Sequence, residues 1–363
     1  MSVFSQLMMR RFHSAVNYIP LTVVGSPTIN NMILSNTTSA NYVKFNCGTN
    51  TIDVWEMSID FVFPTNPAQS YNALISRVSS GFQIFNKTSG NGLQIEINGS
   101  EQIITFGDLV RGNNYNINIK YNAGSWVAVL TNKDTSATST KTTTTSNVWF
   151  LSGEFRFGLT QSGNYGYDDS INLATSYIKI GTTKYNFQFT IPLTKVGSPT
   201  ITDGVVSGFS SADYVKTGLS FILQASSNIE FYLRFKIDVA TGNKSLLNIG
   251  SIWSAPLISV SDNYISGAII GSMGTTASER LEVDTYYRVK ITMNNSVSNG
   301  YIYNDNGTLR AEKNNNPLSF ADRTGNFLVG ATYGTSTPAI NSIDLNNSYI
   351  IINGTKYIFT IGA

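Results

Sequence analysis

The 363-residue sequence predicts an all-β fold of two tandem antiparallel β-sandwich domains of jelly-roll type. Three observations predict this fold. The chain contains an internal repeat, apolar and polar residues alternate with a period of two, and Asn-Gly pairs separate such alternating runs. The content of β-branched residues, Gly and Asn disfavours helices anywhere beyond a short N-terminal helix or arm.

Residues 1–17 are the first predicted element, a short amphipathic helix or arm. The amphipathic pattern comes from residues that recur at helical spacing: Val3, Phe4, Leu7, Met8, Arg11 and Phe12. An isolated helix this short is marginal in water, so we expect it to order only by docking onto a neighbouring subunit. Two other interpretations stay open, a frayed terminus and, because the segment has no acidic residue, a mitochondrial transit peptide.

Two homologous units follow the arm, a first domain at 18–189 and a second at 190–363. The matching blocks share one offset of 172 (191 − 19): 19–29 with 191–201, 39–44 with 211–216, Tyr115 with Tyr287, Gly158 with Gly330, and 170–187 with 342–359. This period is far too long for a solenoid repeat, so the constant offset indicates a domain duplication. No polar linker separates the two units.

Within each unit the alternation predicts half-buried strands. The alternating runs are 55–63 (WEMSIDFVF), 93–97, 115–121, 231–237 (FYLRFKI) and 287–293. Asn98-Gly99, Asn306-Gly307 and Asn353-Gly354 supply the positive φ angles that tight hairpin turns need. Trp55 is in phase with apolar neighbours and is expected in the core, and core packing is also favoured for Trp126, Trp149 and Trp253.

Composition excludes several classes of function. Charged residues make up 13% and aromatic residues 12%, which is unlike a disordered chain. The net charge of +2 gives no case for nucleic acid, and no apolar run is long enough to span a membrane. One cysteine (Cys47) and one histidine (His13) exclude an intrachain disulfide and a Cys/His zinc site, and leave almost no room for a catalytic triad.

The end of the second unit carries a family resemblance. The block from Ser342-Ile343-Asp344-Leu345 through Ser348-Tyr349-Ile350 to Asn353-Gly354 resembles the C-terminal signature of concanavalin A-like lectin/glucanase (laminin-G-like) domains of phage virion proteins. The hairpin at 301–307 resembles a late segment of the same domains. The first unit matches less well, since Gly181-Thr182 stands where the second has Asn353-Gly354. The resemblance implies the jelly-roll fold and a family habit of binding glycans or proteins.

A glucanase needs two carboxylates about 5–5.5 Å apart if it retains the anomeric configuration. The catalytic strand implied by the resemblance carries closely spaced Glu and Asp residues, and this sequence has no such run. Glu56 and Asp60 share a strand face but alternate with an apolar set, so we expect them to face solvent. The sequence therefore predicts a protein that is not an enzyme.

Calcium is the one cofactor left open, since Asp168, Asp169 and Asp344 lie near predicted loops. No spacing resembles a dedicated calcium loop, and no cofactor is expected. For a glycan, the best single candidate is the Gly-rich loop 163–169 of the first unit. Tyr165 and Tyr167 would offer aromatic faces, and Asn164, Asp168 and Asp169 would offer polar groups. The alternative is that both tyrosines pack against the domain or a neighbouring subunit.

The expected function is a structural and adhesive component of a bacteriophage particle, on the tail or the capsid. Its expected partners are other virion proteins, bound through residues 1–17, further copies of itself, and host-surface polysaccharide. The alternatives are a secreted cellular carbohydrate-binding module and, less favoured, a glucanase-fold enzyme.

Overall fold

The computed structural model describes thirteen stretches of the chain: 17–47, 54–65, 71–78, 81–87, 91–97, 102–145, 153–160, 162–164, 166–210, 212–237, 243–250, 257–330 and 342–361. Every regular element in them is a β-strand, which confirms the all-β prediction. The first strand begins at Asn17, so the predicted N-terminal arm lies, but for that residue, outside the described residues. Tyr165, Trp149, Trp253 and the Asn98-Gly99 turn also lie outside them.

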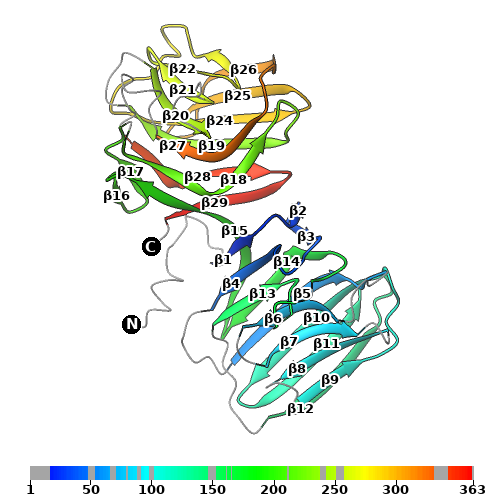
Figure 1. The fold of residues 1–363 in the computed structure, drawn as a ribbon. Coiled ribbons are helices and arrows are strands. Elements are labelled where there is room, and N and C mark those ends of the chain that lie inside the picture. The colour runs from blue at the N-terminus through cyan, green and yellow to red at the C-terminus, as the bar shows by residue number, and fades with distance from the viewer. Residues whose placement is uncertain are drawn as a thin grey trace. The chain divides into compact units, whose positions relative to one another are not determined.

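The chain separates into two compact units, Met1–Phe189 and Thr190–Ala363 (Figure 1). In the first unit two sheets enclose an apolar core. One sheet has the strand order β12 (Thr138–Thr144), β11 (Ser125–Asn132), β10 (Asn114–Asn122), β5 (Val54–Val62), β14 (Ile171–Ile180) and β15 (Thr183–Val196), with β3 (Ile33–Ser35) and β2 (Thr28–Asn30) beside the start of β14. The other has the order β9 (Gln102–Phe106), β8 (Gly92–Ile97), β7 (Gln83–Lys87), β6 (Tyr71–Arg77), β13 (Glu154–Phe157) and β4 (Tyr42–Asn46).

A single strand, β1 (Asn17–Val24), closes the first unit by joining both sheets. Residues 17–21 run parallel to 185–189 of β15, and residues 22–24 run antiparallel to β4. Ile19 and Leu21 lie in the part of β1 that pairs with β15, and both are buried in the core.

The second unit repeats this strand order. Its first series is β26 (Leu309–Pro317), β25 (Val297–Asn304), β24 (Tyr286–Asn294), β19 (Ile229–Lys236), β28 (Ser342–Ile352) and β29 (Thr355–Ile361), with β17 (Val205–Ser207) and β16 (Thr200–Thr202) beside the start of β28. Its second series is β23 (Gly271–Met273), β22 (Tyr264–Gly267), β21 (Ile258–Ser261), β20 (Asn243–Ile249), β27 (Arg323–Val329), β18 (Tyr214–Leu223) and the last residues of β15.

The matched tyrosines of the repeat make the same contact in both units. The Tyr115 hydroxyl accepts a hydrogen bond from the backbone N–H of Val110 at 2.8 Å. The Tyr287 hydroxyl accepts one from Glu282 at 3.0 Å. Both rings are buried. Each tyrosine therefore fixes the loop that precedes its own strand.

The repeated Val-Gly-Ser-Pro segment needs glycine for a steric reason. Gly25 and Gly197 have φ angles of +66° and +68°. A Cβ atom on either would lie 2.0 Å from the Ala40 oxygen or 2.3 Å from the Ala212 oxygen. A side chain would be strained here in each unit, so both copies keep the glycine.

The core follows the alternation in the sequence. Along β5, Trp55, Met57, Ile59 and Phe61 are at most 2% exposed, while the residues between them point to the opposite face. Trp126 on β11 is also fully buried, as expected. The predicted turn at Asn353-Gly354 is confirmed, with φ angles of +47° and +75° between β28 and β29.

Candidate functional site

The polar side chains of the main sheet in each unit lie on the face opposite the core. We call these the first-unit face, carried mainly by β5, β10 and β14, and the second-unit face, carried mainly by β19, β24, β25 and β28. Because the side chains on a strand alternate between faces, every second residue of these strands belongs to its face. The two faces occupy matching positions but differ in charge and in aromatic content.

Asp60 of β5 is the centre of the first-unit face. Its carboxylate accepts hydrogen bonds from Lys133 Nζ at 2.8 Å, from Asn116 Nδ2 at 2.7 Å and from the Thr175 hydroxyl. Burial alone would raise the pKa of Asp60, but these hydrogen bonds and the charge of Lys133 outweigh it and hold the pKa below its usual value. Asp60 is thus an ionised carboxylate in a structural ion pair.

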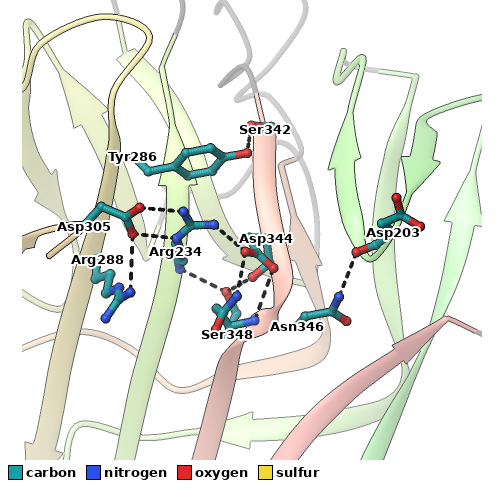
Figure 2. Close-up of polar contacts among 10 residues, drawn as sticks. Asp203, Arg234, Tyr286, Arg288, Asp305, Ser342, Asp344, Asn346 and Ser348 are labelled. Carbon is teal, nitrogen blue, oxygen red and sulfur yellow. Dashed lines mark hydrogen bonds and ion pairs between the residues drawn. The ribbon is translucent and has the colours of Figure 1, made fainter. Parts of the chain in front are cut away.

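The second-unit face carries the opposite charge at the matching position. Figure 2 shows the Arg234 guanidinium between the carboxylates of Asp305 and Asp344. Its Nε and Nη2 donate to the two oxygens of Asp305, each at 2.7 Å, and the arginine also covers the Tyr286 ring, with 3.9 Å from Cζ to the ring centroid. The hydrogen bonds to Asp305 are the largest cause of a raised pKa for Arg234. The same contacts hold the pKa of Asp305 below its usual value.

A serine hydroxyl organises the backbone beneath each ion pair. Ser176 accepts from the N–H of Asp60 at 3.0 Å and donates to the carbonyl of Asn172 at 2.6 Å. Ser348 makes both contacts at the matched positions, at 3.0 and 2.6 Å. In each unit the strand pairing shifts register here, as at a β-bulge. The two units therefore share this backbone geometry and differ in the charges placed on it.

A tyrosine paired with a glutamate is common to both faces. The Tyr177 hydroxyl donates to Glu56 at 2.6 Å, and the Tyr349 hydroxyl donates to Glu230 at 3.0 Å. A lysine Nζ lies 4.0 Å from the ring centroid of each tyrosine. Burial and the adjacent Glu56 carboxylate raise the pKa of Tyr177 to about 12, so its hydroxyl remains a donor at neutral pH.

Four further tyrosines distinguish the second-unit face. Together with Tyr349 they form what we call the tyrosine face: Tyr232, Tyr286, Tyr301, Tyr303 and Tyr349, all partly exposed. Tyr232 and Tyr349 stack with ring centroids 4.8 Å apart and planes 7° apart. Tyr301 and Tyr303 lie side by side on β25 at 6.3 Å. The positions of the four in the first unit hold Ser58, Asn114, Val129 and Thr131.

The tyrosine face could have been found in the sequence. Tyr232 alternates with buried Phe231 and Leu233, while Tyr301 and Tyr303 flank buried Ile302. A period-two strand that carries tyrosine on its polar side places aromatic rings in solvent. Tyrosine on the polar side of an alternating strand is therefore the signal that identifies this face in the sequence.

The structure corrects one residue of the predicted glycan loop. Tyr167 is 1% exposed, its hydroxyl donates to the Val62 carbonyl at 2.7 Å, and its ring packs edge-on against Phe61 at 6.5 Å. It is a core residue and offers no ring face to a ligand. Asn164 and Asp168 are exposed and Asp169 is half-buried, while Tyr165 lies outside the described residues.

The other charged candidates also have structural partners. Glu56 and Asp60 lie on the polar face, but Asp60 is 6% exposed and held in its ion pair, so the expectation that it faces solvent is wrong. Asp344, considered above for calcium, is held by Arg234. In the stretches that the structure describes, no three His, Cys, Asp or Glu side chains gather as a metal-ligand set. None of the described segments is a helix that could cross a membrane.

We expect the first unit to lose stability in acid through Asp60. A carboxylate whose folded-state pKa is depressed contributes stability above its unfolded-state pKa of about 3.9, and this is lost as the pH falls through the folded-state pKa. Urea unfolding of the wild type and Asp60→Asn between about pH 6 and pH 2 measures this. The wild type should have the steeper acid dependence, and equal slopes would contradict the prediction.

The comparisons with known proteins concern the fold alone. Neither a protein-family model nor a curated protein matches the chain. Among solved structures, the enzymatically active domain of tailspike protein 2 of bacteriophage CBA120 matches at 16% identity over 46% of this chain, with a TM-score of 0.36. The match spans 29% of that domain's chain, so this chain corresponds to less than a third of its length.

Two further similar structures come from other settings. Domains LG4-5 of the mouse laminin alpha1 chain match at 9% identity over 92% of this chain and 93% of theirs, with a TM-score of 0.31. Lectin II from Ulex europaeus matches at 13% identity over 46% of this chain and 92% of its own, with a TM-score of 0.33. Similarity at this level carries no conclusion about function.

Proposed function

We propose that this chain is a non-catalytic, adhesive component of a bacteriophage particle that binds polysaccharide through the tyrosine face of its second unit. The observation that carries the binding function is the set of partly exposed tyrosines with charged groups between them. The place on a particle rests on the resemblance of the block around 342–354 to phage virion domains. Residues 1–17 would dock the chain onto other proteins of that particle.

The chemistry of the tyrosine face suits a sugar chain. Tyrosine combines an apolar ring with a polar hydroxyl, so it packs on the C–H faces of a sugar ring and hydrogen-bonds its hydroxyls. Lys290 and Glu230, joined at 3.0 Å, lie beside the stacked Tyr232 and Tyr349 and supply a donor and an acceptor. A few polar groups among aromatic rings are typical of ligand sites in general.

The ion pairs of this face argue against hydrolysis. A general acid in a glycosidase needs a carboxyl group whose pKa is raised. Asp305 instead has a lowered pKa, because Arg234 donates two hydrogen bonds to it. The same guanidinium holds Asp344, so both carboxylates have a positional role. We therefore propose binding without catalysis.

Replacing Tyr301 and Tyr303 together by alanine should weaken polysaccharide binding at least tenfold. The loss of two ring faces removes contacts worth about 1 kcal/mol each. Binding to an array of purified bacterial capsular polysaccharides and lipopolysaccharide O-chains measures it, with affinities from calorimetry. The matched control is Val129→Ala with Thr131→Ala, which changes the corresponding positions of the first unit.

The double tyrosine variant should keep its circular dichroism spectrum, since both side chains are on the surface. Binding that is unchanged in this folded variant would contradict the proposed site. Mass spectrometry of purified bacteriophage particles tests whether the chain is one of their components. Its absence from these particles would contradict the virion role.

A further inference from the structure

The edge strand β12 (Thr138–Thr144) of the first unit is exposed to solvent along most of its length, and its close neighbour β9 in the other sheet does not pair with it. It ends its sheet and pairs with β11 over seven residue pairs without a register shift, and no other strand of the described residues pairs with it. Six of its seven residues are exposed and Thr143 is half-buried, so the side chains on both faces of the strand are largely in water. It buries little apolar surface, so its backbone hydrogen bonds to β11 hold it in place.

The direction of the free backbone groups follows from the flanking hydrogen bonds. The N–H of Asn132 donates to the Ala137 carbonyl at 2.8 Å, and that of Thr145 donates to the Gly124 carbonyl at 2.9 Å. Residue pairs in an antiparallel ladder alternate between hydrogen-bonded and non-hydrogen-bonded pairs. The backbone N–H and C=O groups of the odd-numbered residues of β12 therefore point toward β11. The N–H and C=O groups of Thr138, Thr140 and Thr142 then point outward from the sheet.

The matching edge in the second unit is protected. Strand β26 (Leu309–Pro317) has two register shifts against β25, ends in proline and carries Arg310, Glu312 and Lys313. Bulges, proline and charge are the devices by which proteins keep edge strands from pairing with other chains. The sequence of β12 is TSTKTTT, and Lys141 is its only such device. Of two equivalent edges, one is therefore blocked and the other is left able to pair.

We propose that β12 pairs antiparallel with β12 of a second copy of this chain, so that the two main sheets continue into one. A two-fold axis at Thr140 places the outward groups of Thr138 opposite those of Thr142 in the partner, and Lys141 opposite Ser139. This register keeps the two lysines from lying directly opposite each other, and it pairs threonine with threonine. The strand has no acidic residue that would select a basic partner, whereas its uniform Thr and Ser side chains fit a copy of themselves.

Thr142→Pro tests this pairing in the full chain. Proline removes the outward N–H of residue 142, which occurs twice in the two-fold pair, and leaves the bonds to β11 intact. Sedimentation equilibrium should give twice the chain mass for the wild type and for the control Thr142→Ala at tens of micromolar. Thr142→Pro should give the single-chain mass, with an unchanged circular dichroism spectrum.

A second measurement on the wild type covers the case in which the proline variant misfolds. Hydrogen exchange should protect the amides of Thr140 and Thr142 at high concentration and leave them unprotected on dilution. A wild type that is monomeric throughout, a Thr142→Pro variant that stays dimeric, or exchange at these amides that does not depend on concentration would each overturn the proposal. Association that buries another segment would do the same.

Discussion

Replacing Tyr167 by alanine is expected to lower the free energy of unfolding of the first unit by about 4 kcal/mol, as large-to-small substitutions of buried aromatic residues do. The ring is 1% exposed and packs against Phe61. Its hydroxyl donates to the Val62 carbonyl, and burial raises the pKa of Tyr167 well above its usual value, so the hydroxyl stays protonated. The variant loses both the packing and this hydrogen bond.

Two controls separate the contribution of the buried ring from those of its hydroxyl and of the exposed part of the loop 163–169. Tyr167→Phe keeps the ring and should cost about 1 kcal/mol, the usual value for one hydrogen bond. Asn164→Ala changes an exposed residue of the same loop and should leave stability unchanged. Urea denaturation followed by circular dichroism measures all three. A Tyr167→Ala variant as stable as the wild type would contradict the buried position.

Removal of Arg234 is expected to destabilise the second unit by about 3 kcal/mol, because a buried ion pair that loses one partner leaves the other charge uncompensated. Asp344 is 5% exposed and accepts from Arg234, while Asp305 is bonded to the same guanidinium. Arg234→Ala leaves both carboxylates close together without a cation. The change should be visible in urea denaturation, with hydrogen exchange assigning it to the strands of the second unit.

The first unit supplies the matched rescue for this variant. Arg234→Asp with Asp305→Lys and Asp344→Asn places the residue types of Asp60, Lys133 and Asn172 on the second-unit backbone. Since both units share the bulge and its serine, the exchanged charges should recover a large part of the lost stability. If Arg234→Ala costs less than 1 kcal/mol, the network does not stabilise the unit in the way we infer.

The strands were predictable because burial imposes the pattern from which they were inferred. Trp55, Met57, Ile59 and Phe61 alternate because one face of β5 is dry, and a dry face excludes polar side chains. The turn at Asn353-Gly354 was predictable for a local reason, since positive φ angles favour these two residue types. Both signals act between residues close in sequence.

The site was less predictable because its contacts join distant residues. Arg234 meets Asp344 across 110 positions, and nothing in either neighbourhood names the partner. The prediction that the loop 163–169 exposes Tyr167 was wrong for a related reason. Its Gly166 is required because a Cβ would lie 2.0 Å from the Thr37 carbonyl, so that glycine serves close packing rather than exposure of Tyr167. Only the fold reveals which of these two roles a glycine has.

The parallel pairing of β1 with β15 gives the first unit a defined response to mechanical tension. Asn17 lies opposite Tyr185 and Leu21 lies opposite Phe189, so the two strands run in the same direction. A pull applied at Asn17 and at Thr190 acts on opposite ends of this ladder and slides the strands along each other. All its hydrogen bonds are then strained together, whereas peeling a hairpin breaks them one after another. In the adhesive role proposed above, a chain held at one end by a particle and at the other by a surface would resist detachment in this shearing direction.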